Sequence, residues 1–265
     1  MAATYLDAIL NAHRDRARRD RRVWQERAET LYYQGPSFLE ALRPDATTRI
    51  KVIAEVKRRS PSKGWINENL DPAALARAYE GGGASAVSVL TDEDHFAGSS
   101  ADLSVVRANT VLPVLRKDFT VSENDVLDAA QMGAGAVLLI VAALEDDELR
   151  TFLDLAHRVN LDALVEVHDA HEARRATDVG ARIVGVNQRD LRNFEVDEAR
   201  ATALVSALDP TAVRVAESGI TSVSDVQRTA HAGFDAVLVG EAFVRSSDPA
   251  ALVREFASVT RSGRD

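Results

Sequence analysis

An acidic and a basic side chain stand two residues apart where an apolar stretch ends, Glu55 and Lys57 in the segment VIAEVKRRSPSKG (52–64). Side chains two positions apart on a strand point to the same face, so this carboxylate and this ammonium should lie side by side. The loop that follows adds more cations, the hydroxyl of Ser60 and a glycine. This pattern is typical of a site for an anionic substrate, although a strand-end ion pair beside a solvated basic loop explains the segment alone equally well.

More acidic, basic and amide side chains end apolar segments further along the chain: Lys117, Glu166, Asn187 and Glu217. Brought to one mouth, such groups form acid/base pairs that exchange protons near neutral pH. Burial there can lower the pKa of a lysine, while the pKa of a carboxylate can be raised by burial or held down by a cationic neighbour. Nucleophilic catalysis is less favoured, because neither Ser60 nor Ser218 lies in a nucleophile elbow. A Schiff base through Lys57 or Lys117 stays open.

The elements that must position these residues alternate regularly from residue 50 onward. Short apolar segments predict eight strands, at 52–55, 86–90, 114–116, 136–140, 163–166, 183–186, 213–216 and 236–239. Amphipathic segments between them predict helices, at 72–79, 122–132, 145–158, 170–179, 196–207, 222–231 and 249–257. Strands that are apolar throughout and alternate with helices imply a parallel sheet buried on both faces. This count and length favour a closed (β/α)8 TIM barrel over an open doubly wound sheet, with the chemistry at the C-terminal strand ends.

We predict a single α/β domain over residues 1–265, in which an N-terminal helical extension at 1–46 precedes the barrel at 47–260. The extension is interpreted as one or two helices up to about residue 33 and a short helix at 37–42, capped by Ser37. Its basic run at 14–22 is interpreted as a solvated helix face rather than a surface for a polyanion.

Composition excludes several classes of protein. A net charge of −9 argues against nucleic-acid binding. No run reaches the roughly 18 uncharged apolar residues of a membrane helix, and the first 20 residues lack the features of a secretory signal. We therefore expect no membrane association and a cytoplasmic location. The absence of cysteine excludes disulfides and zinc-thiolate sites. His168 and His171, with Asp169 between them, are interpreted as surface residues, so no metal site is predicted.

Glycine-containing turns follow the last two predicted strands. Ser218-Gly219 follows one and Gly240 the other, each leading toward a helix start. Glycine lets a ligand approach the backbone closely, and free N–H groups at a helix start attract anions. Loops after strands seven and eight are also the usual phosphate site of this barrel. We expect a phosphate site there, completed by Ser60 from the first strand; turns that act only as connectors are the alternative.

Six motifs carry a family likeness, namely AEVKRRSPSKG, VLRKDF, ALVEVH, GVNQRDL, AESGI and VLVGEAF. In this order, and over about residues 4–257, they resemble indole-3-glycerol-phosphate synthase of tryptophan biosynthesis. The resemblance implies that 1-(2-carboxyphenylamino)-1-deoxyribulose 5-phosphate is cyclised with loss of carbon dioxide and water. It also favours a monomer and implies no cofactor or metal.

The resemblance further implies a role for each matching residue. Lys117 resembles the general acid that acts on the ketose oxygen, and Glu166 resembles its partner in stabilising the cationic intermediate. Glu55 and Lys57 resemble the pair that serves the dehydration. Asn187 and Glu217 resemble the groups that orient the sugar hydroxyls and the anilino nitrogen. Phosphate binding is implied for Ser60, Ser218, Gly219 and Gly240. Phe96 and Leu138 correspond to an apolar slot for the ring, and Arg189 and Leu238 complete the binding set.

One position departs from the family pattern, because Glu241 stands where many relatives have a small hydroxyl residue. A carboxylate beside a phosphate is unfavourable, so we expect its side chain to turn outward while its backbone N–H binds.

Two alternative functions remain open. Another phosphosugar barrel, such as a phosphoribosylanthranilate isomerase or a tryptophan synthase α-like lyase, would share the phosphate turns. It would not share the combination of Glu55 and Lys57 with Lys117 and Glu166. A non-catalytic phosphosugar-binding barrel would bind the ligand without turnover.

Overall fold

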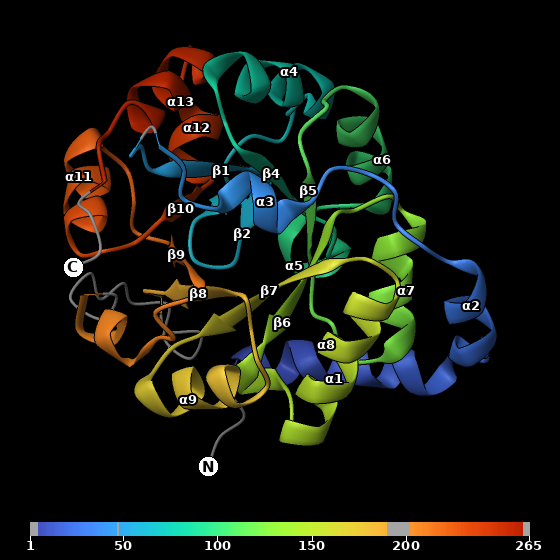
Figure 1. Cartoon of the computed structure of the whole chain (residues 1–265). Helices are drawn as coiled ribbons and strands as arrows, with labels where there is room; N and C mark the ends of the chain where they lie inside the picture. Colours follow the sequence, from blue (N-terminus) through green and yellow to red (C-terminus); the bar gives the residue numbers. More distant parts are fainter. Residues whose placement is uncertain (1–4, 47, 190–201, 262–265) are drawn as a thin grey trace.

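The computed structural model describes residues 5–46, 48–189 and 202–261. Within these ranges, eight parallel strands close into a barrel in the order β1-β10-β9-β8-β7-β6-β5-β4, and β4 pairs back to β1. Figure 1 shows the strands at the centre of a ring of helices. The predicted TIM barrel is therefore confirmed. The strands are β1 Lys51–Val56, β4 Ala86–Leu90, β5 Val114–Lys117, β6 Ala136–Ile140, β7 Asp162–Val167, β8 Ile183–Asn187, β9 Val213–Glu217 and β10 Ala236–Val239.

The helices of the ring mostly begin at a side chain that accepts a backbone N–H of their first turn, which satisfies groups that the helix itself leaves unpaired. Ser122 and Asp169 are two such caps. No helix in the described ranges combines the length and the apolar character needed to cross a bilayer. The helices of the ring are α4 Pro72–Gly82, α6 Ser100–Ala108, α7 Glu123–Gln131, α8 Asp146–Arg158, α9 Ala170–Asp178, α11 Val223–His231 and α13 Pro249–Ala257.

Most predicted elements lie within three residues of the observed ones. The predicted helix at 196–207 falls partly on residues 190–201, outside the described ranges; its end forms the short helix η2, Val205–Ala207. The sequence analysis did not identify several short elements in the βα loops, nor α6. These short elements are a ribbon of β2 Arg59–Ser60 and β3 Gly64–Trp65, and the helices α5 Glu93–Phe96, η1 Val141–Ala143 and α12 Glu241–Arg245.

The first helix, α1 Tyr5–Arg19, lies against the loops at the C-terminal end of the barrel. His13 is 4% exposed, and its Nε2 lies 2.9 Å from Asp92 Oδ2, just after β4. The His13 ring also lies 5.2 Å from the ring of Phe119, just after β5. Arg14 donates to Glu148 and to the carbonyl of Ala143, beyond β6. These contacts attach α1 to three successive loops of the barrel mouth.

The other N-terminal helices lie elsewhere. α2 Trp24–Thr30 packs on α7, where Arg22 and Arg27 pair with Asp128 at 2.6 Å. The short α3 Phe38–Leu42 crosses the centre of the ring in Figure 1. Ser37 Oγ donates to Asp162 at the start of β7, so α3 covers the N-terminal end of the barrel. The basic run is thus a solvated face only in part, because two of its arginines, Arg14 and Arg22, dock the extension on the barrel.

Candidate active site

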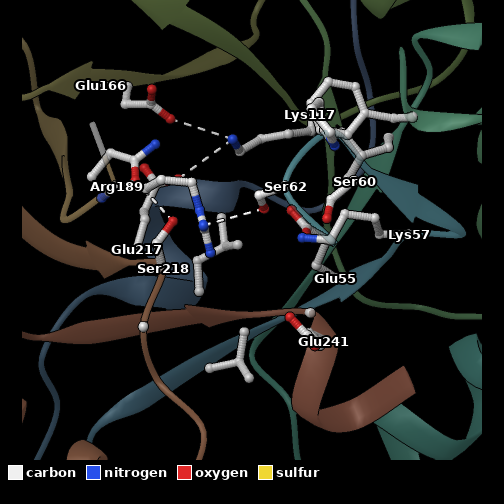
Figure 2. A pocket seen from close by; sticks show the side chains of 18 of the residues that line it. Glu55, Lys57, Ser60, Ser62, Lys117, Glu166, Arg189, Glu217, Ser218 and Glu241 are labelled. Carbon is white, nitrogen blue, oxygen red and sulfur yellow. Dashed lines mark hydrogen bonds and ion pairs between the residues drawn. The ribbon is translucent and has the colours of Figure 1, made fainter. Parts of the chain in front are cut away.

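A cavity of about 820 Å³ lies at the C-terminal ends of the strands. All eight strands, or the loops that follow them, contribute predicted residues to its lining. Figure 2 shows Lys117, Glu166 and Glu217 among the side chains that line this cavity. The structure thus brings the whole predicted set together, while the role of each residue stays a prediction. The lining includes Glu55, Lys57, Ser60, Phe96, Lys117, Leu138, Glu166, Asn187, Arg189, Glu217, Ser218, Gly219, Leu238 and Gly240.

Lys117 lies between two carboxylates. Its Nζ is 3.3 Å from Glu166 Oε2 and 3.5 Å from Glu217 Oε2. Together with Glu55, these residues come from β1, β5, β7 and β9, which are alternate strands of the barrel. Alternate strands of a TIM barrel project their side chains into shared layers. The top layer of this barrel is therefore charged, with one ammonium among three carboxyl groups.

Burial and charge shift the pKa values within this layer. Burial alone would lower the pKa of Lys117, but Glu166, Glu217 and Glu55 outweigh it and raise that pKa. This is opposite to the lowered lysine pKa that burial suggested from sequence. Burial and the neighbouring carboxylates raise the pKa of Glu217 to about 8, against the opposing effect of Lys117. Burial also disfavours the charge of Glu166, but Lys117 and His168 lower its pKa. The directions of these shifts favour an ammonium on Lys117, an ionised Glu166 and a proton retained on Glu217.

A second acid/base pair lies at the end of β1, where Lys57 Nζ is 2.5 Å from Glu55 Oε1. Glycines on neighbouring strands make room for two of the carboxyl groups. A Cβ on Gly240 would lie 2.4 Å from Glu55 Oε1, and one on Gly185 would lie 2.1 Å from Glu217 Oε1. The sequence analysis assigned Gly240 only to phosphate and missed Gly185. A glycine inside an otherwise apolar strand was the available indication of a close approach.

The turn after β9 is held in a left-handed conformation, with φ of 68° at Ser218 and 73° at Gly219. For a serine this backbone is costly by about 1 kcal/mol. Two hydrogen bonds hold it there, from Ser218 Oγ to Asn187 Oδ1 at 2.8 Å and from Gln188 Nε2 to the Ser218 carbonyl at 3.0 Å. Packing and hydrogen bonds thus impose this turn beside the cavity.

Other parts of the cavity lining offer polar groups without partners among the described residues. Ser60 Oγ is buried and has no hydrogen-bond partner among the described residues. The short helix α12 begins directly after Gly240 without a side-chain cap. Buried polar groups are normally hydrogen-bonded, so these groups are suited to a polar ligand. Glu241 also lines the cavity, and its carboxylate pairs with Arg245 at 3.1 Å.

The basic loop after β1 contributes fewer cations to the cavity than its sequence suggests. Arg58 pairs with Asp102, and Arg59 donates to the carbonyl of His95 and lies over the ring of Trp65. Neither guanidinium is part of the cavity lining, whereas Lys57 and Lys63 are. On the opposite side, Arg189 Nη1 donates to Ser62 Oγ at 3.2 Å, which joins this loop to the end of β8.

One side of the cavity is apolar. Phe96 and Leu138 lie there as predicted, and they are joined by Phe119, Leu90 and Ile140. The rings of Phe96 and Phe119 are 6.3 Å apart. The sequence analysis quoted Phe119 within a motif but gave it no role. Its place two residues after the lysine of β5 was the available indication.

The prediction for His168 is wrong. The side chain is only 12% exposed, and its Nε2 lies 3.5 Å from Glu166 Oε1. His168 is the first residue after β7 and comes before α9, which begins at Ala170. It is therefore not on the helix surface, and its ring folds back beside Glu166. His171, on α9, is exposed as predicted.

Among the described residues, one cluster has the spacing of metal ligands: His13, Asp92 and Asp118, with ligand atoms within 4.8 Å of one another. Their oxygens are already engaged, since Asp118 Oδ2 accepts from Thr91 and from Arg116. The Arg116 guanidinium would also repel a cation. We interpret the cluster as the contact that docks α1 on the barrel.

Comparison with known proteins agrees with this geometry. A model of the family described as Indole-3-glycerol phosphate synthase matches residues 6–256. A protein of that name from Micrococcus luteus is 54% identical over 215 residues, covering 81% of this chain and 80% of the relative. The one from Mycolicibacterium vanbaalenii is 44% identical over 97% of this chain and 95% of its own length.

A solved structure supports the fold alone. Thiamine phosphate pyrophosphorylase from Pyrococcus furiosus superposes with a TM-score of 0.59 at 17% identity, covering 79% of this chain and 94% of that one. The family resemblance of the six strand-end motifs is confirmed by the family model and by the sequence relatives. This chain belongs to the indole-3-glycerol phosphate synthase family.

Proposed function

We propose that this chain converts 1-(2-carboxyphenylamino)-1-deoxyribulose 5-phosphate to indole-3-glycerol phosphate, with ring closure, decarboxylation and dehydration. Membership of the family makes it a decarboxylating carbon–carbon lyase of tryptophan biosynthesis. The observation that carries the proposed chemistry is the position of Lys117 between Glu166 and Glu217 at the cavity. This arrangement supplies a proton donor and a carboxylate at one point, as the reaction requires.

In the first step, the aromatic carbon that bears the carboxylate attacks the ketose carbonyl carbon, and a carbon–carbon bond forms. The carbonyl oxygen takes a proton from the Lys117 ammonium and becomes a hydroxyl. The carboxylate of Glu166 stabilises the cationic ring that results. The carbon–carboxylate bond then breaks, carbon dioxide leaves, and its electron pair returns to the ring.

The last step removes water. The hydroxyl leaves with a proton from an acid, while a base takes a proton from the carbon beside the nitrogen, and the indole double bond forms. Glu55 and Lys57, in contact at 2.5 Å, form a suitable acid/base pair for this step. To Asn187 and Glu217, which line the same cavity, we assign the orientation of the sugar hydroxyls and the anilino nitrogen.

Substrate binding would use both sides of the cavity. We assign the phosphate to the turn at Ser218 and Gly219, to the backbone after Gly240 and to the unpartnered hydroxyl of Ser60. The ring would lie against Phe96 and Leu138. Holding the two ends of a flexible substrate in one geometry supplies several kcal/mol, on the order of that seen for oriented intramolecular reactions. We further propose that the enzyme acts in the cytoplasm as a monomer, without cofactor or metal.

The test is indole fluorescence after the purified protein is mixed with the carboxyphenylamino-deoxyribulose phosphate, with and without EDTA. We expect the indole emission to grow at the same rate in both. Binding by calorimetry without indole formation would refute the proposal and favour a non-catalytic barrel. Turnover of phosphoribosylanthranilate instead would favour a sister enzyme.

A further inference from the structure

The carboxylate of Glu166 has a second charged neighbour that the proposed mechanism does not use. Lys117 contacts its Oε2, whereas His168 Nε2 lies 3.5 Å from its other oxygen, Oε1. The His168 side chain is 12% exposed and that of Glu166 is 1% exposed. Water therefore screens this pair poorly, and the charge of His168 acts strongly on Glu166.

Glu172, in the first turn of α9, contacts the Nδ1 side of the His168 ring, opposite the side that faces Glu166. Its Oε2 accepts from the backbone N–H of His168 at 2.7 Å and lies 3.1 Å from His168 Nδ1. An ionised carboxylate can only accept hydrogen bonds, so Nδ1 carries a proton. Nε2 is buried, has no hydrogen-bond partner among the described residues and faces Glu166. The ring is thus placed to present a proton to the catalytic carboxylate.

Lys117 alone does not decide which of its two carboxyl neighbours keeps a proton, because its distances to them are 3.3 and 3.5 Å. We infer that His168 is a positioning residue that, held by Glu172, keeps Glu166 ionised and leaves the remaining proton on Glu217. This inference rests on the proposed role of Glu166 in the reaction.

The other groups around Glu166 and Glu217 either favour the ionised form of Glu166 over that of Glu217 or act on both carboxyl groups to a similar extent. Lys117 faces Glu166 from β5, Glu217 faces it from β9, and the Asn187 amide on β8 donates to it and lowers its pKa. Glu55 on β1 acts on Lys117 and Glu217. Burial opposes the charge of His168, but the hydrogen bond to Glu172 and the charges of Glu166, Glu172 and Glu217 outweigh it and raise its pKa. These contacts therefore favour the imidazolium form of His168 beside Glu166.

Loss of His168 should change the pH dependence of the reaction. Without the adjacent cation the pKa of Glu166 rises, so the carboxylate is protonated at a higher pH than in the wild type. An opposite charge at this distance shifts a carboxyl pKa by about one unit or more. We expect the acidic limb of the kcat–pH profile to move upward by about one pH unit or more in His168→Asn. In Glu172→Gln it should move the same way by less, because the ring stays but loses its anionic partner.

The experiment measures indole formation across pH for the full chain and for His168→Asn, Glu172→Gln and His171→Asn. The last is a matched control, since it removes an exposed imidazole only three residues further along the chain, on α9, and should leave the profile in place. A purely structural role for His168 would lower kcat at every pH or lower the Tm, without moving the acidic limb. That result would overturn the inference.

A second measurement does not depend on turnover. Coupling between two titrating groups is reciprocal, so Glu166→Gln should lower the midpoint of the His168 titration, read from its imidazole 15N shifts, by about one unit or more. An unchanged midpoint would overturn the inference even if the wild-type enzyme is fully active. Absence of indole formation by the wild type would instead refute the proposed function.

Discussion

Glu217 should weaken the fold of the free enzyme at neutral and alkaline pH, and Glu217→Gln should relieve that cost. The carboxyl is 3% exposed and lies in a layer with two other carboxyl groups. Its protonated form can donate to Glu166, and the amide of glutamine can donate in the same way. The substitution therefore replaces a group that resists ionisation with a neutral one of the same shape.

The sign and size follow from the pKa of about 8, raised from 4.5. The folded protein holds this proton more tightly than the unfolded chain, so the free energy of unfolding falls as pH rises between these two values. Each pKa unit corresponds to about 1.4 kcal/mol, which gives a loss of about 3 kcal/mol between about pH 5 and pH 8. The glutamine variant lacks this titration. Its stability relative to the wild type should rise by about 3 kcal/mol over that range.

The assay is urea unfolding of both proteins at about pH 5 and pH 8, without substrate, so that the difference between them cancels most other titrations. Glu68→Gln makes the same chemical change at an exposed loop position and serves as the control. If the difference in the free energy of unfolding between Glu217→Gln and the wild type is the same at both pH values, the buried proton on Glu217 does not exist.

Three further substitutions test other parts of the site. Lys117→Ala should lower kcat by at least about 100-fold while the product still binds in calorimetry, since general acid catalysis contributes that much; a near-normal kcat would remove Lys117 from the mechanism. Gly185→Ala places a Cβ 2.1 Å from Glu217 Oε1 and should cost about 1–3 kcal/mol of stability, with a lower kcat; an unchanged Tm would contradict the close approach. Glu241→Ser should change KM by less than about tenfold, because the carboxylate is paired with Arg245 at a partly exposed position. A larger fall in KM would mean that it opposes the phosphate.

The barrel and its mouth were predictable because the pattern is local. Most strands are short apolar runs closed by a charged residue, an amide or a glycine, and parallel strands in a barrel bring those ends together. The sequence analysis did not identify the helix α6, because only two of its apolar residues, Leu103 and Val106, are fully buried. The residue beside them, Asp102, is buried but charged. Such a segment does not show a strong helical period in sequence.

The electrostatic behaviour of the site was not predictable in the same way. Burial alone lowers a lysine pKa, and the opposite direction for Lys117 depends on how many carboxylates surround it in space. The position of His168 depends on one detail, namely that the ring folds back toward Glu166 before α9 begins. Sequence spacing placed His168 correctly after the strand but did not determine which way its ring points.

The contacts of α1 and α3 also impose an order on folding during synthesis. Arg14 bonds to Glu148 across 134 residues, and Ser37 bonds to Asp162 across 125. Both helices leave the ribosome long before these partners exist, and contacts of such long sequence separation form slowly. These two contacts therefore cannot form until more than half of the chain has been translated. Completion of the two ends of the barrel is then among the last events of folding, and a stalled nascent chain that stops before residue 148 should lack both contacts and leave α3 accessible to protease.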